Sequence, residues 1–113
     1  MKTNDKEIFA AQAEICKALA NAKRLEIIHL LATKGRQFAA ELMTSAGLTK
    51  TNLSQHMRVL KQAGIVAFER EGTHIRYELA SPKIGEACET LHEFLVERLE
   101  RNGRLAAGKK RNI

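Results

Sequence analysis

The sequence predicts a mainly α-helical domain with one small β-hairpin, arranged as a winged helix-turn-helix. Apolar residues recur at helical spacing toward both ends of the chain. A short helix, a glycine-bearing turn and a second helix follow one another in the middle, and a β-rich hairpin comes directly after them. Because 113 residues is the size of one domain, we expect residues 1–113 to form a single unit.

Two helices are predicted in the first third of the chain. Asn4 followed by Glu7 has the spacing of a capping box, which opens a helix over residues 4–20. A second helix begins after Asn21 and ends at Gly35. One apolar face of the first helix is marked by Ile8, Ala11, Ile15 and Leu19. In the second helix, Leu25, Ile28 and Leu31 are expected to face inward.

Residues 39–63 have the pattern of a helix-turn-helix. A short helix is expected from residue 39 to 46, and Gly47 ends it. Thr49 then provides a cap for a second helix, which runs to about residue 63 and ends at Gly64. In such a motif the second helix is the one that enters a nucleic-acid groove.

The rest of the chain predicts a wing and a final helix. Residues 65–80 are predicted to form a hairpin that turns at Gly72, and residues 37–38 are predicted to form a short edge strand. A last helix is expected over residues 82–101, followed by a basic tail, residues 102–113, that we expect to be disordered. The apolar stripe of the last helix is Ile84, Cys88, Leu91, Leu95 and Leu99.

The helix after the turn carries a polar face without any carboxylate. Its apolar side is defined by Leu53, Met57 and Leu60, and His56 falls toward that side, where we expect it to be packed. Amide and guanidinium groups read base edges in the major groove, whereas lysine contacts phosphate. The predicted DNA contacts are Lys50, Thr51, Asn52, Ser54, Gln55 and Arg58 in this helix, with Arg70, His74 and Arg76 in the wing.

Composition narrows the classes of function. The formal net charge is +6, which fits a polyanionic partner. The two cysteines form no CxxC motif, and no apolar run approaches the roughly 20 residues of a membrane span. A cytoplasmic protein with reduced thiols is expected. An enzyme is not expected, because the sequence has no nucleophile–base pattern, phosphate-binding loop or metal-ligand cluster.

Three segments together resemble the ArsR/SmtB family of winged-helix repressors. Residues 19–28, LANAKRLEII, are similar to the family's LA-x-x-x-R-L-x-I-L opening. Residues 54–66, SQHMRVLKQAGIV, are similar to its S-x-H-L-x-x-L-x-x-A-G-L-V motif, and residues 70–77 to its R-x-G-x-x-x-x-Y wing. The resemblance covers about residues 15 to 80 and implies a homodimer built on the first and last helices. It also implies binding to an imperfect inverted repeat in duplex DNA, with release on sensing an inducer.

The sequence departs from the family's sensor motifs. Where arsenic sensors carry C-V-C it has residues 38–40, FAA, and where sulfide sensors carry a second-helix cysteine it has His29. The zinc-type positions of the last helix correspond to Ser81, Lys83, Phe94 and Glu97. None of these three effectors can therefore be carried over.

Cys16 and Cys88 remain as a candidate inducer site, one on each predicted dimerisation helix. A thiol modification or a soft metal ion would join them. The competing interpretation is that both are small buried apolar residues and that no inducer site exists. Cys88 with His92 one turn later is also a candidate half of a metal site.

Two other functions remain open at this stage. A winged-helix module that binds protein has no need to keep its recognition face free of acids. RNA binding normally uses exposed aromatic residues for stacking, and most of the five aromatic residues here fall at positions expected to face the core.

Overall fold

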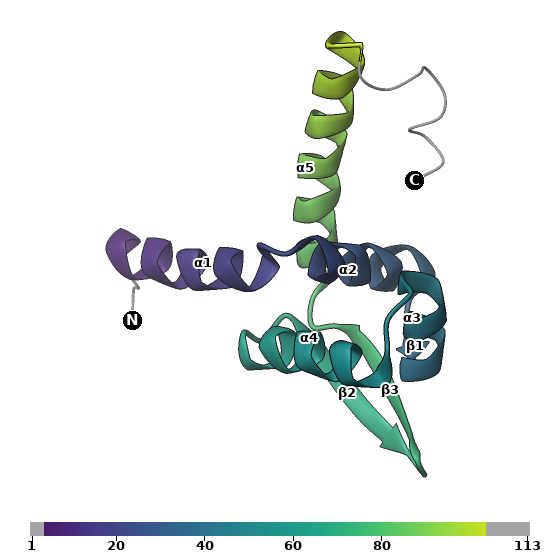
Figure 1. Cartoon of the computed structure of the whole chain (residues 1–113). Helices are drawn as coiled ribbons and strands as arrows, with labels where there is room; N and C mark the ends of the chain where they lie inside the picture. Colours follow the sequence, from purple (N-terminus) through teal and green to yellow (C-terminus); the bar gives the residue numbers. More distant parts are fainter. Residues whose placement is uncertain (1–3, 104–113) are drawn as a thin grey trace.

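The structure is a computed structural model that describes residues 4–103, and its element order is the predicted one (Figure 1). The elements are α1 (Asp5–Leu19), α2 (Ala22–Lys34), β1 (Gln37–Phe38), α3 (Ala39–Ala46), α4 (Lys50–Gln62), β2 (Val66–Glu71), β3 (His74–Leu79) and α5 (Pro82–Arg101). This arrangement confirms the winged helix-turn-helix fold. The basic residues of the tail beyond Gly103 lie outside the described residues.

The helices begin where side-chain caps were expected. The Asn4 side-chain oxygen accepts a hydrogen bond from the Glu7 backbone N–H at 2.9 Å, and Asn21 accepts one from Arg24 at 3.0 Å. Ser81 caps α5, with Pro82 at its first position. Each cap satisfies a backbone N–H that the helix itself leaves without a partner, which fixes where the helix starts.

The three strands form one antiparallel sheet in the order β1-β3-β2. The β2–β3 hairpin turns through only Gly72 and Thr73, because Glu71 pairs with His74. Gly72 has a positive φ of 64°, the conformation that a two-residue hairpin of this kind requires at its first turn position. The predicted edge strand at Gln37–Phe38 is confirmed and pairs with β3.

The core is built around α2 and α4. Its fully enclosed side chains come from three helices, α2, α3 and α4, and from the turn after α4: Ile27, Ile28, Leu42, Met57, Leu60 and Ile65. The prediction that Leu25 faces inward is wrong, since this side chain is 40% exposed. The inward positions of α2 are Ile27, Ile28 and Leu31, and this places Leu25 at the margin of the buried face.

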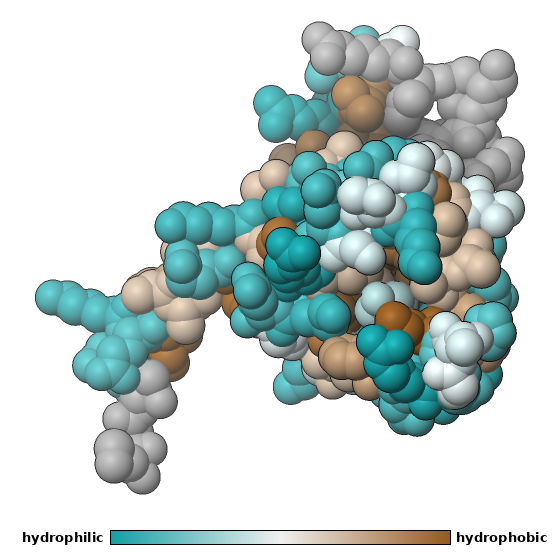
Figure 2. Space-filling view, turned by 60° about the horizontal axis from the view of Figure 1, so that its bottom comes forward, coloured by the Kyte–Doolittle hydropathy of each residue, from teal (hydrophilic) through white to brown (hydrophobic). Residues whose placement is uncertain are grey.

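Helices α1 and α5 project from the body as two arms (Figure 1). Both carry exposed apolar side chains, and brown patches mark the two arms in Figure 2. The residues concerned are Ile8, Phe9, Leu91, Phe94 and Leu95. Such exposure is unusual for a monomeric domain and marks surfaces that associate.

The aromatic residues do not lie where the sequence pattern placed them. Phe9, Phe68 and Phe94 are 67%, 47% and 52% exposed, whereas Tyr77 is buried. Phe9 and Phe94 lie on the projecting arms, and Phe68 lies on the hairpin. The earlier argument against RNA from core-facing aromatics is therefore wrong, although these three rings lie on three different elements rather than on one stacking platform.

Helix α5 approaches α2 very closely at its base. A Cβ atom added at Gly85 would lie 2.9 Å from the Cβ of Ala32 and 3.1 Å from Leu79. Since real Cβ atoms do not approach other atoms that closely, glycine is what allows the two helices to meet here. Among residues 4–103, no helix has both the length and the apolar character needed to cross a membrane.

Candidate nucleic-acid interface

A tight turn sets the direction of α4 relative to α3. Gly47 adopts a left-handed conformation at φ 64°, and the Leu48 backbone N–H donates to the Met43 carbonyl at 2.9 Å. The Thr49 hydroxyl then accepts from the Asn52 N–H at 3.1 Å. The chain therefore ends one helix and begins the next within three residues, as a helix-turn-helix requires.

The two faces of α4 differ sharply in burial. Leu53, Met57 and Leu60 are at most 2% exposed and pack into the core, as predicted. Every candidate contact residue of this helix is exposed: Lys50, Thr51, Asn52, Ser54, Gln55 and Arg58. The helix contains no acidic residue, so nothing on this face repels a phosphate.

The polar side chains of this face are not used by the fold. Within residues 4–103, no hydrogen bond or ion pair engages the side chains of the six candidate contact residues of α4. Folding thus leaves their donors and acceptors available to an outside partner. A purely structural polar face would be expected to form pairs along the helix or with its neighbours.

The two faces of the hairpin separate the wing candidates. In the observed register, Arg70 pairs with Ile75 and shares a face with Phe68 and Tyr77. Burial raises the pKa of the Tyr77 hydroxyl, and the positive charge of the nearby Arg70 offsets only part of this rise. Arg70 is exposed, so it adds a positive charge to the surface of the wing.

His74 and Arg76 lie on the opposite face of the hairpin and contact Phe38. The Arg76 guanidinium lies 4.4 Å from the centre of the Phe38 ring and 3.4 Å from a Glu71 carboxylate oxygen, and His74 makes an edge contact with the same ring. Arg76 therefore already has partners within the fold.

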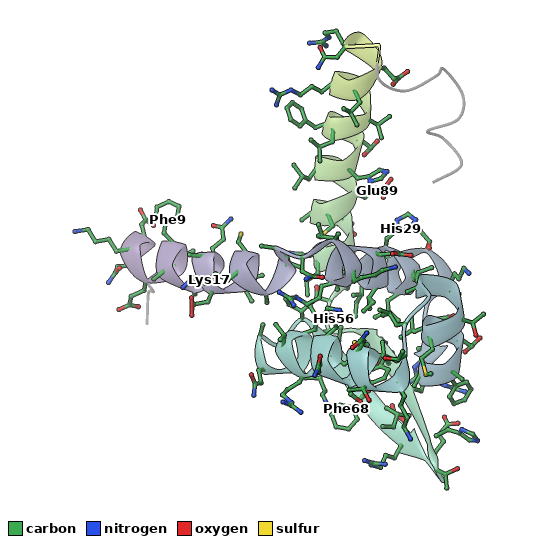
Figure 3. All side chains as sticks on the ribbon, viewed as in Figure 1. Phe9, Lys17, His29, His56, Phe68 and Glu89 are labelled. Atoms are coloured by element: carbon green, nitrogen blue, oxygen red, sulfur yellow. The ribbon has the colours of Figure 1, made fainter. Side chains whose placement is uncertain are left out.

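Sequence reasoning missed a cation that joins α4 to the wing. The Lys61 ammonium lies 4.4 Å above the centre of the Phe68 ring, whose position on β2 is labelled in Figure 3. Only the positive charge of residue 61 could be noted from the sequence, because the contact depends on how the hairpin folds back. It connects the exposed face of α4 with the wing.

Two further cations, both on α2, fasten this helix to α3 and to α1. The Lys23 ammonium donates to the Ala46 carbonyl at 2.6 Å, at the C-terminus of α3, and also pairs with Glu26. The Arg24 guanidinium donates to the Ala18 carbonyl at the end of α1. Both cations stabilise carbonyl groups that their helices leave without partners.

His56 lies near these two cations, on the core side of α4. It is half-buried, and burial together with the positive charges of Arg24 and Lys23 lowers the pKa of its imidazole. The imidazole is therefore neutral at pH 7, and the expected packed position is confirmed. His56 is not on the exposed face of α4.

Neither cysteine is in a disulfide. Cys16 is exposed on α1, and Cys88 is half-buried on α5 against the core. Burial and the nearby Cys16 raise the pKa of the Cys88 thiol. Lys17, next to Cys16, pairs with Glu14 at 3.0 Å. Within residues 4–103, no three His, Cys, Asp or Glu side chains already have the spacing of a metal site.

Comparison with known proteins identifies the family. Residues 21–67 match the family model described as bacterial regulatory protein, arsR family. An HTH-type transcriptional regulator of Mycobacterium tuberculosis is 35% identical over 89 residues, which cover 79% of this chain and 78% of that protein. The chain belongs to the ArsR family.

Other members of the ArsR family agree in sequence and fold. The arsenical resistance operon repressor of Bacillus subtilis is 30% identical over 84 residues, covering 74% of this chain and 80% of the repressor. The homodimeric winged helix-turn-helix DNA-binding domain of a Mycobacterium bovis protein has 31% identity and a TM-score of 0.77, covering 88% of this chain and 93% of that domain. The ArsR-family chain is thus a transcriptional regulator with the predicted fold.

The environment of His56 predicts that acid destabilises this ArsR-family fold. Because its pKa is lowered in the folded state, the unfolded chain binds more protons as the pH falls through the ordinary value of about 6.5. The free energy of unfolding should therefore fall between pH 7.5 and pH 5. In urea denaturation, the midpoint concentration of His56→Gln should fall less over this pH range than that of the unaltered protein. His74→Gln, which removes an exposed imidazole, serves as the control, and equal losses in all three proteins would contradict the argument.

Proposed function

We propose that two copies of this chain bind an imperfect inverted repeat in duplex DNA and repress transcription until an inducer releases them. The observation that carries the proposal is the exposed face of α4, which has no acid and whose candidate contact side chains have no partner among residues 4–103. Gln55 and Arg58 read base edges, Lys50 holds phosphate, and Thr51, Asn52 and Ser54 flank them. Arg70 at the wing reaches the adjacent backbone or minor groove, with His74 and Arg76 on its other face.

The two arms support homodimerisation. On α5, Leu91, Phe94 and Leu95 are about half exposed. On α1, Ile8 is also about half exposed, and Phe9 is 67% exposed. Pairing these stripes across a two-fold axis would remove them from water. The related Mycobacterium bovis domain is described as homodimeric.

A dimer would present two α4 helices to DNA. In helix-turn-helix dimers the recognition helices meet half-sites about 34 Å, one helical turn, or a multiple of it apart. The symmetry of the protein then requires an inverted repeat. The repressor role draws support from the Bacillus subtilis relative, which is named a repressor.

The inducer is proposed to act on Cys16 and Cys88. The two thiols come from the two arms, and the effect of Cys16 on the pKa of Cys88 supports their proximity. Oxidation to a disulfide would transfer two electrons to an oxidant such as a polysulfide and release two protons. A thiophilic ion such as As(III) or Cd(II) would instead bind both sulfurs. Either change would link α1 to α5 and alter the spacing of the recognition helices.

DNA readout is tested with the tightest duplex selected from a random-sequence pool. Gln55→Ala should weaken binding to it by about 1–3 kcal/mol and relax preference at one base position. Lys50→Ala should weaken the selected and random duplexes alike and lower the salt slope by about one unit. Glu93→Gln, an exposed change on α5, is the control. The proposal is contradicted if Gln55→Ala leaves the discrimination between selected and random duplex unchanged, or if no duplex is selected. In either case α4 is not a DNA-reading helix, and the alternative that the module binds protein is favoured.

Dimerisation is tested by charging the apolar stripe of α5. Leu91→Lys should shift the protein to monomer in sedimentation velocity at micromolar concentration, because a cation would be buried without a partner at the interface. Glu93→Lys introduces the same side chain two residues away, on the other side of the helix, and should leave the dimer intact. A monomer in the unaltered protein, or a dimer in Leu91→Lys, would refute the proposed interface.

The thiol proposal is tested by comparing DNA binding of the unaltered protein with a Cys16→Ser/Cys88→Ser double variant. Polysulfide, As(III) or Cd(II) should weaken binding of the unaltered protein to its selected duplex and leave the double variant unaffected. Non-reducing mass spectrometry measures the disulfide directly. Equal responses in both proteins, or a response in neither, would mean that the cysteines are structural.

A further inference from the structure

A second cluster of ligand-type side chains lies away from the cysteines and from the α4 face. His29 on α2 and His92 on α5 stack with their ring centres 6.0 Å apart and their planes inclined by 23°. A Glu89 carboxylate oxygen lies 3.9 Å from Nδ1 of His29. Figure 3 shows His29 and Glu89 on the same side of the junction between α2 and α5.

These three side chains line an open groove of about 860 Å³ between the two helices. The side chains of His29 and Glu89 are 32% and 51% exposed, and His92 is half-buried. Glu26 and Lys34 also line the groove, and Glu26 already pairs with Lys23. An ion from solvent can therefore reach all three groups without any backbone movement.

The separations are close to those of a shared metal ion. Two ligands on tetrahedral Zn²⁺ with bonds near 2.0–2.1 Å lie about 3.3 Å apart. The nitrogen–oxygen distance between His29 and Glu89 is 3.9 Å, about 0.6 Å longer than this. Among residues 4–103, no three such side chains already stand at the spacing of a metal site. The three groups are at the ends of side chains on an open groove, so an ion would draw them together through rotations about side-chain bonds.

The pair on α5 adds a reason to place an ion here. Glu89 and His92 are three residues apart, so both project from one face of the helix. A Glu-x-x-His pair of this kind supplies metal ligands from within one helix in other helical proteins. His29 then contributes the third ligand from α2, which makes the site a bridge between two elements of one protomer.

We propose that His29, Glu89 and His92 bind a divalent transition-metal ion such as Zn²⁺ or Co²⁺. Two imidazole nitrogens and one carboxylate oxygen suit these borderline ions better than the soft ions that thiols select. Water completes the tetrahedron at the open side of the groove. The site lies within one chain, and its ligands are not the positions of the last helix that correspond to the zinc-type sensors of the family.

The test is a titration of the untagged full-length protein with Co²⁺, followed through its visible d–d absorption, with Zn²⁺ added in competition. The unaltered protein should develop the bands of four-coordinate Co²⁺ with one ion per chain and no sulfur-to-cobalt charge transfer. Since loss of an outer-shell partner alone costs about 10–100-fold in metal affinity, His29→Ala and Glu89→Gln should each weaken binding by at least about tenfold. His74→Ala and the Cys16→Ser/Cys88→Ser variant are matched controls that should bind as tightly as the unaltered protein.

Thermal unfolding provides a second measurement that needs no DNA. Zn²⁺ should raise the unfolding temperature of the unaltered protein and of both controls, because a ligand that binds only the folded state stabilises it. It should not raise that of Glu89→Gln, an exposed near-isosteric change expected to fold normally. Equal affinity in Glu89→Gln and the unaltered protein, a sulfur charge-transfer band, or loss of binding in the cysteine variant would overturn the proposal.

Discussion

The packing of one side of α4 into the core determines the position of almost everything else that matters for function. Leu53, Met57 and Leu60 are enclosed, so the helix cannot rotate about its axis without exposing them. That restriction points the opposite, polar face outward. The sheet, the turn at Gly47 and the α2 helix then serve to hold α4 in this orientation.

Much of this could be predicted from local sequence because local interactions set it. The Asn4, Asn21, Thr49 and Ser81 caps each join residues two or three positions apart. The apolar periodicity of α4 likewise identified the exposed face. Those features need no knowledge of the tertiary structure, and the structure places the helix starts where they indicate.

The contacts that sequence reasoning missed depend on how separate elements pack against one another. Arg36 pairs with Glu69 and Glu78, each at 2.9 Å, and these pairs exist only because β2 and β3 align in one register. The stack of His29 on His92 depends on how α5 crosses α2. Leu25 was misplaced for the same reason, since a helical stripe does not reveal how far its neighbours extend to cover it.

The close approach at Gly85 has a mechanical consequence. On α2, only the Ala32 methyl group faces Gly85 there, so a tilt of one helix is passed to the other through a very short contact. From Gly85 to Arg101, α5 is about 24 Å long at 1.5 Å per residue. A tilt of about 5° at this fulcrum moves the far end by roughly 2 Å on that length. The arm therefore amplifies a small tilt at its base, and any contact that holds its far end constrains α2, the helix that packs against α4.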